Sequence, residues 1–352
     1  MPDIYDTLAE HLDNLPAGFP RTESGVELRI LKRLFTPDEA ELATKLTMIP
    51  ETANQIAERL GQDVDSLEER LESMAGRGLI FRSSKGHEAT YMAAQFMVGI
   101  WEYHVQDLDE ELIRDVNEYL PHVMRRAWFE TRTKQMRVIP VSESLEAESS
   151  VMPYEQAERI VREQSKIVLA PCICRREHAM VGSSCGRPEE TCLVFGGAAH
   201  FYEENRLGRP ISIEEALNVL ETGLQAGLVL QPGNAQRPAS MCLCCGCCCQ
   251  ILKNLKTLDR PAEAVHSNYY AEVLTESCSA CGECVERCQM EAITVNETAE
   301  VDLDRCIGCG LCVAVCETGA VRLRQKDDRQ LYEPPENVVE TYMCMAKERG
   351  LL

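Results

Sequence analysis

The stretch CSACGECVERCQMEAITV (278–295) is followed by CIGCGLCVAVCETGAVRL (306–323), and the two share one cysteine pattern. Each has the spacing C-x2-C-x2-C-x3-C, and the second copy begins 28 residues after the first (306 − 278 = 28). Cysteine thiolates at this spacing are the ligands of [4Fe–4S] clusters in proteins that hold two of them. The pair of stretches therefore predicts two [4Fe–4S] clusters and a function in electron transfer. Their ligands would be Cys278, Cys281, Cys284, Cys288, Cys306, Cys309, Cys312 and Cys316.

The two stretches also match at positions other than cysteine. Gly282 corresponds to Gly310, where a side chain would crowd a cluster or disfavour a positive φ. Residues 270–325 thus resemble the bacterial two-cluster ferredoxins. The resemblance implies crossed ligation, in which the fourth cysteine of each run binds the other cluster. The implied sets are Cys278, Cys281, Cys284 and Cys316 for one cluster, and Cys306, Cys309, Cys312 and Cys288 for the second.

One feature departs from the ferredoxin pattern. That family usually has proline after the fourth cysteine, whereas this chain has Gln289 and Glu317. Proline is not a ligand, so we expect a change in loop stiffness or reduction potential and not the loss of a cluster. Zinc is the alternative metal, but zinc sites rarely need eight cysteines at this repeat.

A third cysteine-rich segment, MCLCCGCCC (241–249), contains another C-x2-C-G-x-C. Its members Cys242, Cys245 and Cys248 overlay the first three ligands of each ferredoxin run, but Leu252 stands where the fourth cysteine would be. A remote ligand must complete this third site. The candidates lie upstream and are Cys172, Cys174, Cys185 and Cys192. Together the ten cysteines of this region are enough for one or two further iron–sulfur clusters.

Three cysteines of this segment, Cys244, Cys247 and Cys249, do not fit the overlay. They would serve either a non-cubane cluster or an alternative C-x2-C pair. The local Cys-Cys-Gly string is similar to the cysteine-rich CCG domain of heterodisulfide-reductase-type subunits. That likeness keeps a catalytic cluster in this region open.

Residues 36–82 have the pattern of a small helical module. Thr36 and Pro37 predict the start of a helix, Gly61 ends a second, and a third covers Asp63–Met74 before a short apolar strand. This order resembles a winged-helix domain. Its third helix has five acidic residues and one basic residue, a poor match for a groove lined with phosphates. We therefore expect docking or dimerisation, with DNA binding by a redox-sensing regulator as the alternative.

The predicted fold class is a multidomain α+β protein. It combines a helical N-terminal domain containing the winged-helix-like module, a Cys-rich α/β middle domain and a C-terminal dicluster ferredoxin fold. The apolar segment 88–105 is predicted to be helical, with Met92, Phe96, Gly99 and Tyr103 at helical spacing. The expected boundaries are 1–137 for the helical domain, 138–153 for a linker, 154–265 for the middle domain, 266–325 for the ferredoxin domain and 326–352 for a helical tail.

Composition limits the surroundings in which the protein acts. The 352 residues have a formal net charge of −21, which disfavours binding to nucleic acid or anionic membranes and favours a redox partner with a basic docking surface. The 19 cysteines are odd in number and clustered, unlike a disulfide framework. No signal peptide and no membrane span are predicted, so we expect a cytoplasmic protein of an anaerobic metabolism.

These observations favour an iron–sulfur electron-transfer protein, acting alone, as a homodimer or as a subunit of an oxidoreductase complex. The sequence contains neither a G-x-G-x-x-G nor a Walker motif, so it gives no indication of a bound flavin or nucleotide. We therefore expect a carrier and not an enzyme. An oxidoreductase with a catalytic cluster in the Cys-rich domain is the remaining alternative.

Overall fold

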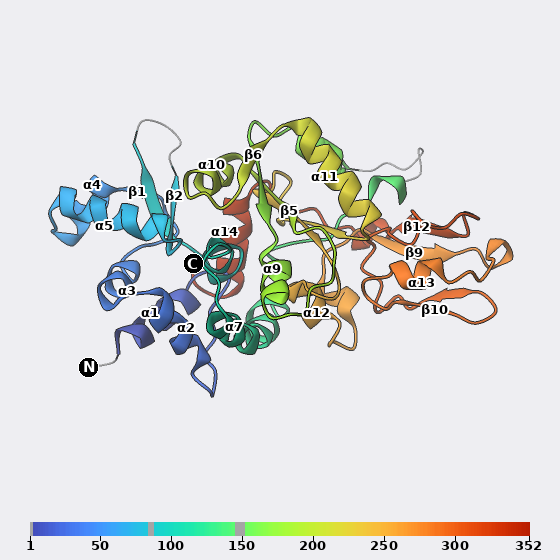
Figure 1. Cartoon of the computed structure of the whole chain (residues 1–352), viewed down its shortest axis with the longest axis horizontal. Coiled ribbons are helices and arrows are strands. Elements are labelled where there is room, and N and C mark those ends of the chain that lie inside the picture. Colours follow the sequence, from blue (N-terminus) through green and yellow to red (C-terminus); the bar gives the residue numbers. More distant parts are fainter. Residues whose placement is uncertain (1–2, 84–87, 145–151) are drawn as a thin grey trace.

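The computed structural model describes residues 3–83, 88–144 and 152–352. Helices and strands are mixed along the chain, as the predicted class requires. Figure 1 shows an elongated molecule, with the first helices and a small sheet at one end and the last strands at the other. The cysteine-rich middle region lies between these two ends.

The N-terminal part packs helices against a small sheet. Helices α1 (Ile4–Asp13), α2 (Val26–Leu34) and α7 (Glu110–Val123) lie together. The module between them has the order α3 (Pro37–Ala43), β1 (Glu51–Thr52), α4 (Ala53–Leu60), α5 (Val64–Gly76), β2 (Ile80–Ser83) and β3 (Thr90–Ala93). Its three strands form an antiparallel sheet in the order β1-β3-β2.

The helix boundaries in this module are those that the sequence predicts. Thr36 forms a capping box with Glu39 at the start of α3, and Gly61 ends α4 with φ 64°. The Asp63 side chain accepts a hydrogen bond from the Ser66 N–H at the start of α5. Local capping chemistry therefore fixes these helices before any tertiary contact is considered.

The prediction of one helix over residues 88–105 is wrong. Residues 90–93 form β3, whose alternate residues Tyr91 and Ala93 are buried, and a tight turn follows in which Val98 has φ 52°. Only Trp101–Tyr103 (α6) is α-helical. Pairing of β3 with β2 outweighs the local helical spacing, because a short apolar run fits either period.

The middle region is built on one sheet of five strands, in the order β6-β4-β5-β8-β7. The strands are β4 (Ile167–Pro171), β5 (Glu190–Phe195), β6 (Arg209–Ile211), β7 (Val229–Pro232) and β8 (Ser240–Cys244). The helices of this region are α8 (Ala157–Arg162), α9 (Ile173–Met180), α10 (Gly196–Glu204), α11 (Ile213–Gln225) and α12 (Gln250–Leu255). All four strand pairs are antiparallel, so the α/β arrangement predicted for this domain is corrected to α+β.

The first half of the expected linker is part of the core. Val138, Ile139 and Val141 are buried, and the Ile139 N–H donates to the Leu230 carbonyl at 3.2 Å. The Val141 N–H donates to the Cys309 carbonyl at 3.1 Å. Residues 138–144 thus join the middle sheet to the C-terminal region, while 145–151 lie outside the described residues. The domain boundaries themselves remain predictions.

The C-terminal region repeats one small unit. Strand β9 (Tyr269–Val273) pairs with β12 (Val321–Gln325), and β10 (Ile293–Val295) pairs with β11 (Ala299–Val301). Gly282 and Gly310 have φ of 86° and 75°, as the sequence predicts. The short helix α13 (Glu283–Arg287) follows Gly282. Helix α14 (Val338–Glu348), capped by Asn337, then returns to the middle of the molecule (Figure 1).

None of the helices in the described ranges is long and apolar enough to cross a membrane.

Candidate iron–sulfur centres

The eight cysteines of residues 278–316 lie in two neighbouring groups. Burial and the nearby Cys281, Cys278 and Cys316 thiols raise the pKa of Cys284. Burial also raises the pKa of Cys312, and the thiols of Cys309, Cys306, Cys288 and Cys284 raise it further. Cys284 thus interacts with the fourth cysteine of the second run, and Cys312 interacts with the fourth cysteine of the first, as crossed ligation requires.

Backbone donors in this region point at the cysteine sulfurs. The Ala271 N–H donates to Sγ of Cys306 at 3.4 Å, and the Ala299 N–H donates to Sγ of Cys278 at 3.3 Å. The two donors are 28 residues apart, and so are the two acceptors (299 − 271 = 306 − 278 = 28). The repeat therefore extends to these hydrogen bonds. Such donors stabilise thiolates and tune cluster potentials, so the residues present fit a pair of [4Fe–4S] clusters.

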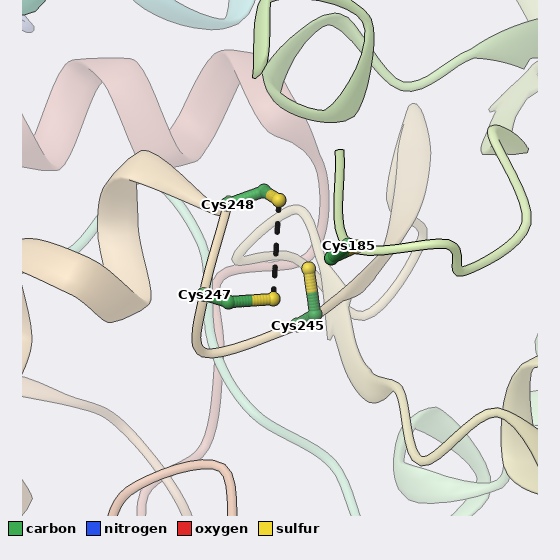
Figure 2. A group of neighbouring side chains, drawn as sticks. All are labelled: Cys185, Cys245, Cys247 and Cys248. Carbon is green, nitrogen blue, oxygen red and sulfur yellow. Dashed lines mark hydrogen bonds between the residues drawn. The ribbon is translucent and has the colours of Figure 1, made fainter. Parts of the chain in front are cut away.

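A separate group of four cysteines lies in the middle region, and we call it the four-thiol group: Cys185, Cys245, Cys247 and Cys248. Their sulfur atoms all lie within 4.8 Å of one another. Cys185 comes from the loop between α9 and β5, whereas the other three come from the turn between β8 and α12 (Figure 2). Four thiols at this separation match the ligand number of one [4Fe–4S] cluster or of a tetrahedral zinc site.

The members of this group differ from the overlay made on the sequence. Cys245 and Cys248 are present and Cys185 is the remote ligand, but Cys247 takes the place expected for Cys242. Cys242 lies on β8, directly opposite Cys192 on β5. The overlay assumes a loop from the first cysteine onward, whereas the strand continues to Cys244 and holds Cys242 within the sheet.

Two arginines donate hydrogen bonds to the four-thiol group. Arg187 Nη1 is 3.3 Å from Sγ of Cys247, and the buried Arg175 Nη1 is 3.7 Å from Sγ of Cys245. Burial alone would raise the pKa of Cys245, but the Cys248 N–H, the Cys247 thiol and Arg175 together lower it to about 7. The thiolate, the form in which cysteine binds metals, is therefore favoured at Cys245, whereas burial and the neighbouring thiols raise the pKa of Cys247 and Cys248. A third arginine nearby in the sequence, Arg176, pairs with Glu189 instead.

Gln289 connects the four-thiol group to the C-terminal region. Its Oε1 accepts a hydrogen bond from the Gly246 N–H at 2.7 Å, and its side chain is buried. A Cβ on Gly246 would lie 2.2 Å from the Gln289 carbonyl oxygen, so only glycine allows this approach. Gln289, which stands where proline is usual, therefore supplies a contact between the two regions. Proline has no side-chain acceptor and would not make it.

The other six cysteines of the middle region form what we call the six-thiol row, in the spatial order Cys172, Cys174, Cys249, Cys244, Cys242 and Cys192. Interactions with Cys172 and Cys249 raise the pKa of the Cys174 thiol. Interactions with Cys242 and Cys249 raise the pKa of Cys244, and Cys192 raises that of Cys242. The row is therefore continuous from the start of α9 to the pair of strands β5 and β8.

Some functional positions give little signal in the sequence. Cys247 belongs to the four-thiol group although the repeated spacing passes over it, and the departure from proline was the one sign that Gln289 is unusual. Cys344 is exposed on α14 and belongs to neither group.

Comparison with known families agrees with the geometry of the C-terminal region. Residues 277–320 match the family model described as the 4Fe–4S dicluster domain. Searches among curated proteins and among solved structures give no match. The matched segment spans both cysteine runs, so these residues form a ferredoxin-like iron–sulfur domain.

Proposed function

We propose that the chain is an iron–sulfur electron-transfer protein with at least three clusters. Two would be held in the ferredoxin-like domain by the crossed sets of cysteines, and a third by the four-thiol group. Clusters bound there would supply one-electron oxidation and reduction. The observation on which this proposal rests is the hydrogen bond between Gly246 and Gln289.

That hydrogen bond gives a short connection between two sets of ligands. Gln289 directly follows Cys288, and Gly246 lies between Cys245 and Cys247. One peptide unit, the Gln289 side chain, one hydrogen bond and a second peptide unit therefore connect Cys288 of the ferredoxin-like domain to Cys245 of the four-thiol group. The contact is buried, which keeps water out of the connection and fixes the two regions relative to each other.

A second contact holds the same two regions together. Arg287, one residue before Cys288, donates to the Leu224 and Gln225 carbonyls at the end of α11, at 2.6 and 3.0 Å. Cations at a helix C-terminus are favourable, because the carbonyls there lack partners within the helix. The ferredoxin-like domain is thus fixed to the middle region at Arg287 and Gln289, the two residues that flank Cys288.

The N-terminal module is proposed to be a winged-helix-like docking element. The order of its helices and its three-stranded sheet support this assignment. The exposed side of α5 presents Asp65, Glu68 and Glu69, which repel the phosphates of DNA and attract a basic protein surface. A redox partner with such a surface, a second copy of the chain or a larger complex is the expected ligand of the module, in a cytoplasmic, oxygen-poor setting.

A catalytic role is the second candidate, and the six-thiol row favours it. Its six cysteines are more than one [4Fe–4S] cluster needs, and all six line a large cavity. The row is thus able to hold a fourth metal centre with thiols to spare. Electrons arriving from the ferredoxin-like domain would then meet a substrate in the middle region.

Iron and sulfide analysis with EPR on anaerobically purified protein tests the main proposal. Three [4Fe–4S] clusters require about twelve irons per chain, and a fourth centre raises the number. The Cys185→Ser variant is expected to lose about four irons and one EPR signal, whereas Cys344→Ser, at an exposed and isolated cysteine, changes neither. About eight irons in the wild-type protein, or zinc in the four-thiol group, would contradict the proposal.

A further inference from the structure

A cavity of about 1380 Å³ lies in the middle of the molecule, against the six-thiol row. Every cysteine of the row lines it, and none of the four-thiol group does. Ligand sites for drug-sized organic molecules have volumes of about 300–1,000 Å³. The space therefore exceeds what a metal centre on the row requires and has room for an organic molecule beside it.

The walls of the cavity are largely apolar. Phe195, Met97 and Val194 contribute buried surface from the turn after β3 and from β5. The exposed residues Ile49, Met343 and Leu352 also line the cavity, and they mark its opening between the N-terminal module and the C-terminal end of the chain. An apolar molecule thus has an apolar route from solvent to the thiols.

Four buried polar atoms of the described lining have no hydrogen-bond partner: Nε1 of Trp101, Oε1 of Gln135, Oδ1 of Asn234 and Nε2 of His11. The amide of Gln135 uses its Nε2 for the Met97 carbonyl and the Tyr342 hydroxyl, both at 2.9 Å. The amide of Asn234 likewise uses its Nδ2, for the Lys134 carbonyl and the Tyr332 hydroxyl. One donor, two amide acceptors and the imidazole nitrogen of His11 are therefore left over, and unpaired buried polar groups are costly unless a ligand satisfies them.

The charges around the cavity exclude a strongly charged ligand. Among the residues that the structure describes, the lining contains one arginine or lysine, Arg237, which is exposed and already paired with Glu336. The carboxyl group of Glu102 also belongs to the lining, and it accepts a hydrogen bond from the Gly99 N–H at 2.9 Å. A ligand carboxylate or phosphate would thus be buried without a cation, at a large cost in free energy.

We propose that this cavity is a substrate site, which binds an uncharged, largely apolar organic molecule against the six-thiol row. The polar end of the molecule has one hydrogen-bond acceptor for Nε1 of Trp101 and N–H donors for Oε1 of Gln135 and Oδ1 of Asn234. A carboxamide group offers this combination. A redox role for this site rests on the proposed function, whereas binding of the organic molecule does not.

The test uses 2-naphthamide as the probe and isothermal titration calorimetry on the anaerobic holoprotein. One molecule is expected to bind per chain, and 2-naphthoate, of the same size but charged at pH 8, is expected to bind at least about tenfold more weakly. Trp101→Phe removes an N–H that has no partner in the protein. It is expected to weaken 2-naphthamide roughly tenfold and to leave naphthalene, which has no polar group, within about twofold.

A blocking variant and its control locate the probe. Ala198→Trp places a large ring in the cavity and is expected to abolish binding, whereas Leu303→Trp, on an exposed turn outside the lining, is expected to leave it unchanged. Iron content and EPR spectra show that each variant is folded and loaded. Because Met343 is exposed at the opening, Met343→Glu is a second blocking variant that does not disturb the core.

Three outcomes would overturn the inference: no binding of 2-naphthamide by loaded protein, equal binding of the charged analogue, or binding that survives both blocking variants. Any of these with all EPR signals intact leaves the electron-transfer proposal standing. Too few irons in protein that still binds 2-naphthamide would instead overturn the electron-transfer proposal and keep the cavity.

Discussion

The backbone N–H of Gly246 donates a 2.7 Å hydrogen bond to Oε1 of Gln289, two residues that are 43 positions apart in the sequence. Gly246 belongs to the turn that supplies three thiols of the four-thiol group, and Gln289 directly follows Cys288 of the ferredoxin-like domain. A proline at position 289 has no side-chain acceptor for this N–H. One of the two residues that depart from the ferredoxin pattern therefore joins the ferredoxin-like domain to the four-thiol group.

Replacing Gln289 with leucine is expected to disturb the four-thiol group more than the ferredoxin-like domain. Leucine keeps the apolar volume but leaves the buried Gly246 N–H without an acceptor, a loss of about 1–3 kcal/mol. We expect a changed EPR signal and faster iron loss at the third cluster, measured by EPR and iron release to a chelator.

Glu317→Leu is the matched control, because Glu317 occupies the equivalent slot in the second repeat (289 + 28 = 317) and is exposed. It should leave all cluster signals as they are. Equal effects of the two substitutions, or an effect of Gln289→Leu on the ferredoxin signals alone, would contradict the joining role of Gln289.

The membership of the four-thiol group is tested by comparing Cys247→Ser with Cys242→Ser. Cys247 belongs to the group, whereas Cys242 is held in β8 opposite Cys192. The first substitution is expected to remove or broaden the EPR signal of the third cluster, with a loss of up to about four irons. The second should keep that signal. The reverse result would restore the assignment made on the sequence overlay.

The sequence predicts those structural features that depend only on residues close together in the chain. The capping box of Thr36, the glycine end of α4 and the positive φ at Gly282 and Gly310 were all predictable, because each is a local requirement of the backbone. The ferredoxin-like domain was predictable for the same reason, since its ligands repeat at fixed short spacing.

Contacts over long distances were not predictable in this way. The segment 88–105 has helical spacing, yet pairing with β2 makes its first part a strand. The end of β8 at Cys244 separates Cys242 and Cys244, which stay in the sheet, from Cys245, Cys247 and Cys248 of the four-thiol group. Spacing alone does not show where a strand stops and a turn begins, so the sequence placed Cys242 with Cys245.

Removing the charge of Arg187 is expected to lower the reduction potential of the third cluster. Arg187 lies 3.3 Å from Sγ of Cys247, and a cation there favours the reduced, more negative state of a bound cluster. Arg187→Gln should shift the midpoint by on the order of tens of millivolts in an EPR-monitored redox titration. Arg187→Lys should shift it less.

The neighbouring Arg176 provides the control for this titration. It donates hydrogen bonds to Glu189, to the Val105 carbonyl and to Gln106, and not to a thiol of the described residues. Arg176→Gln should therefore leave the midpoint unchanged. A shift of the same size in both variants would mean that the overall charge of the protein sets the potential, and not the hydrogen bond to Cys247.

The stability of the protein should decrease as the pH rises, because of Glu102. Burial raises the pKa of its carboxyl group from 4.5 to about 7, so the folded state binds this proton more tightly than the unfolded state does. Its favourable contribution is complete below pH 4.5, decreases as the pH rises, and is lost above about 7. The difference of 2.5 units (7 − 4.5) corresponds to at most about 3 kcal/mol.

The Glu102→Gln variant cannot titrate at this position. Between pH 5 and 8 the melting temperature of the wild-type protein should therefore fall by several degrees relative to the variant, measured anaerobically by the loss of cluster absorbance. Glu300→Gln, on the exposed surface of β11, should follow the wild-type curve. Parallel curves for wild type and Glu102→Gln would show that the carboxyl group is hydrated and titrates at its ordinary pKa, and the cavity would then be wetter than its apolar walls imply.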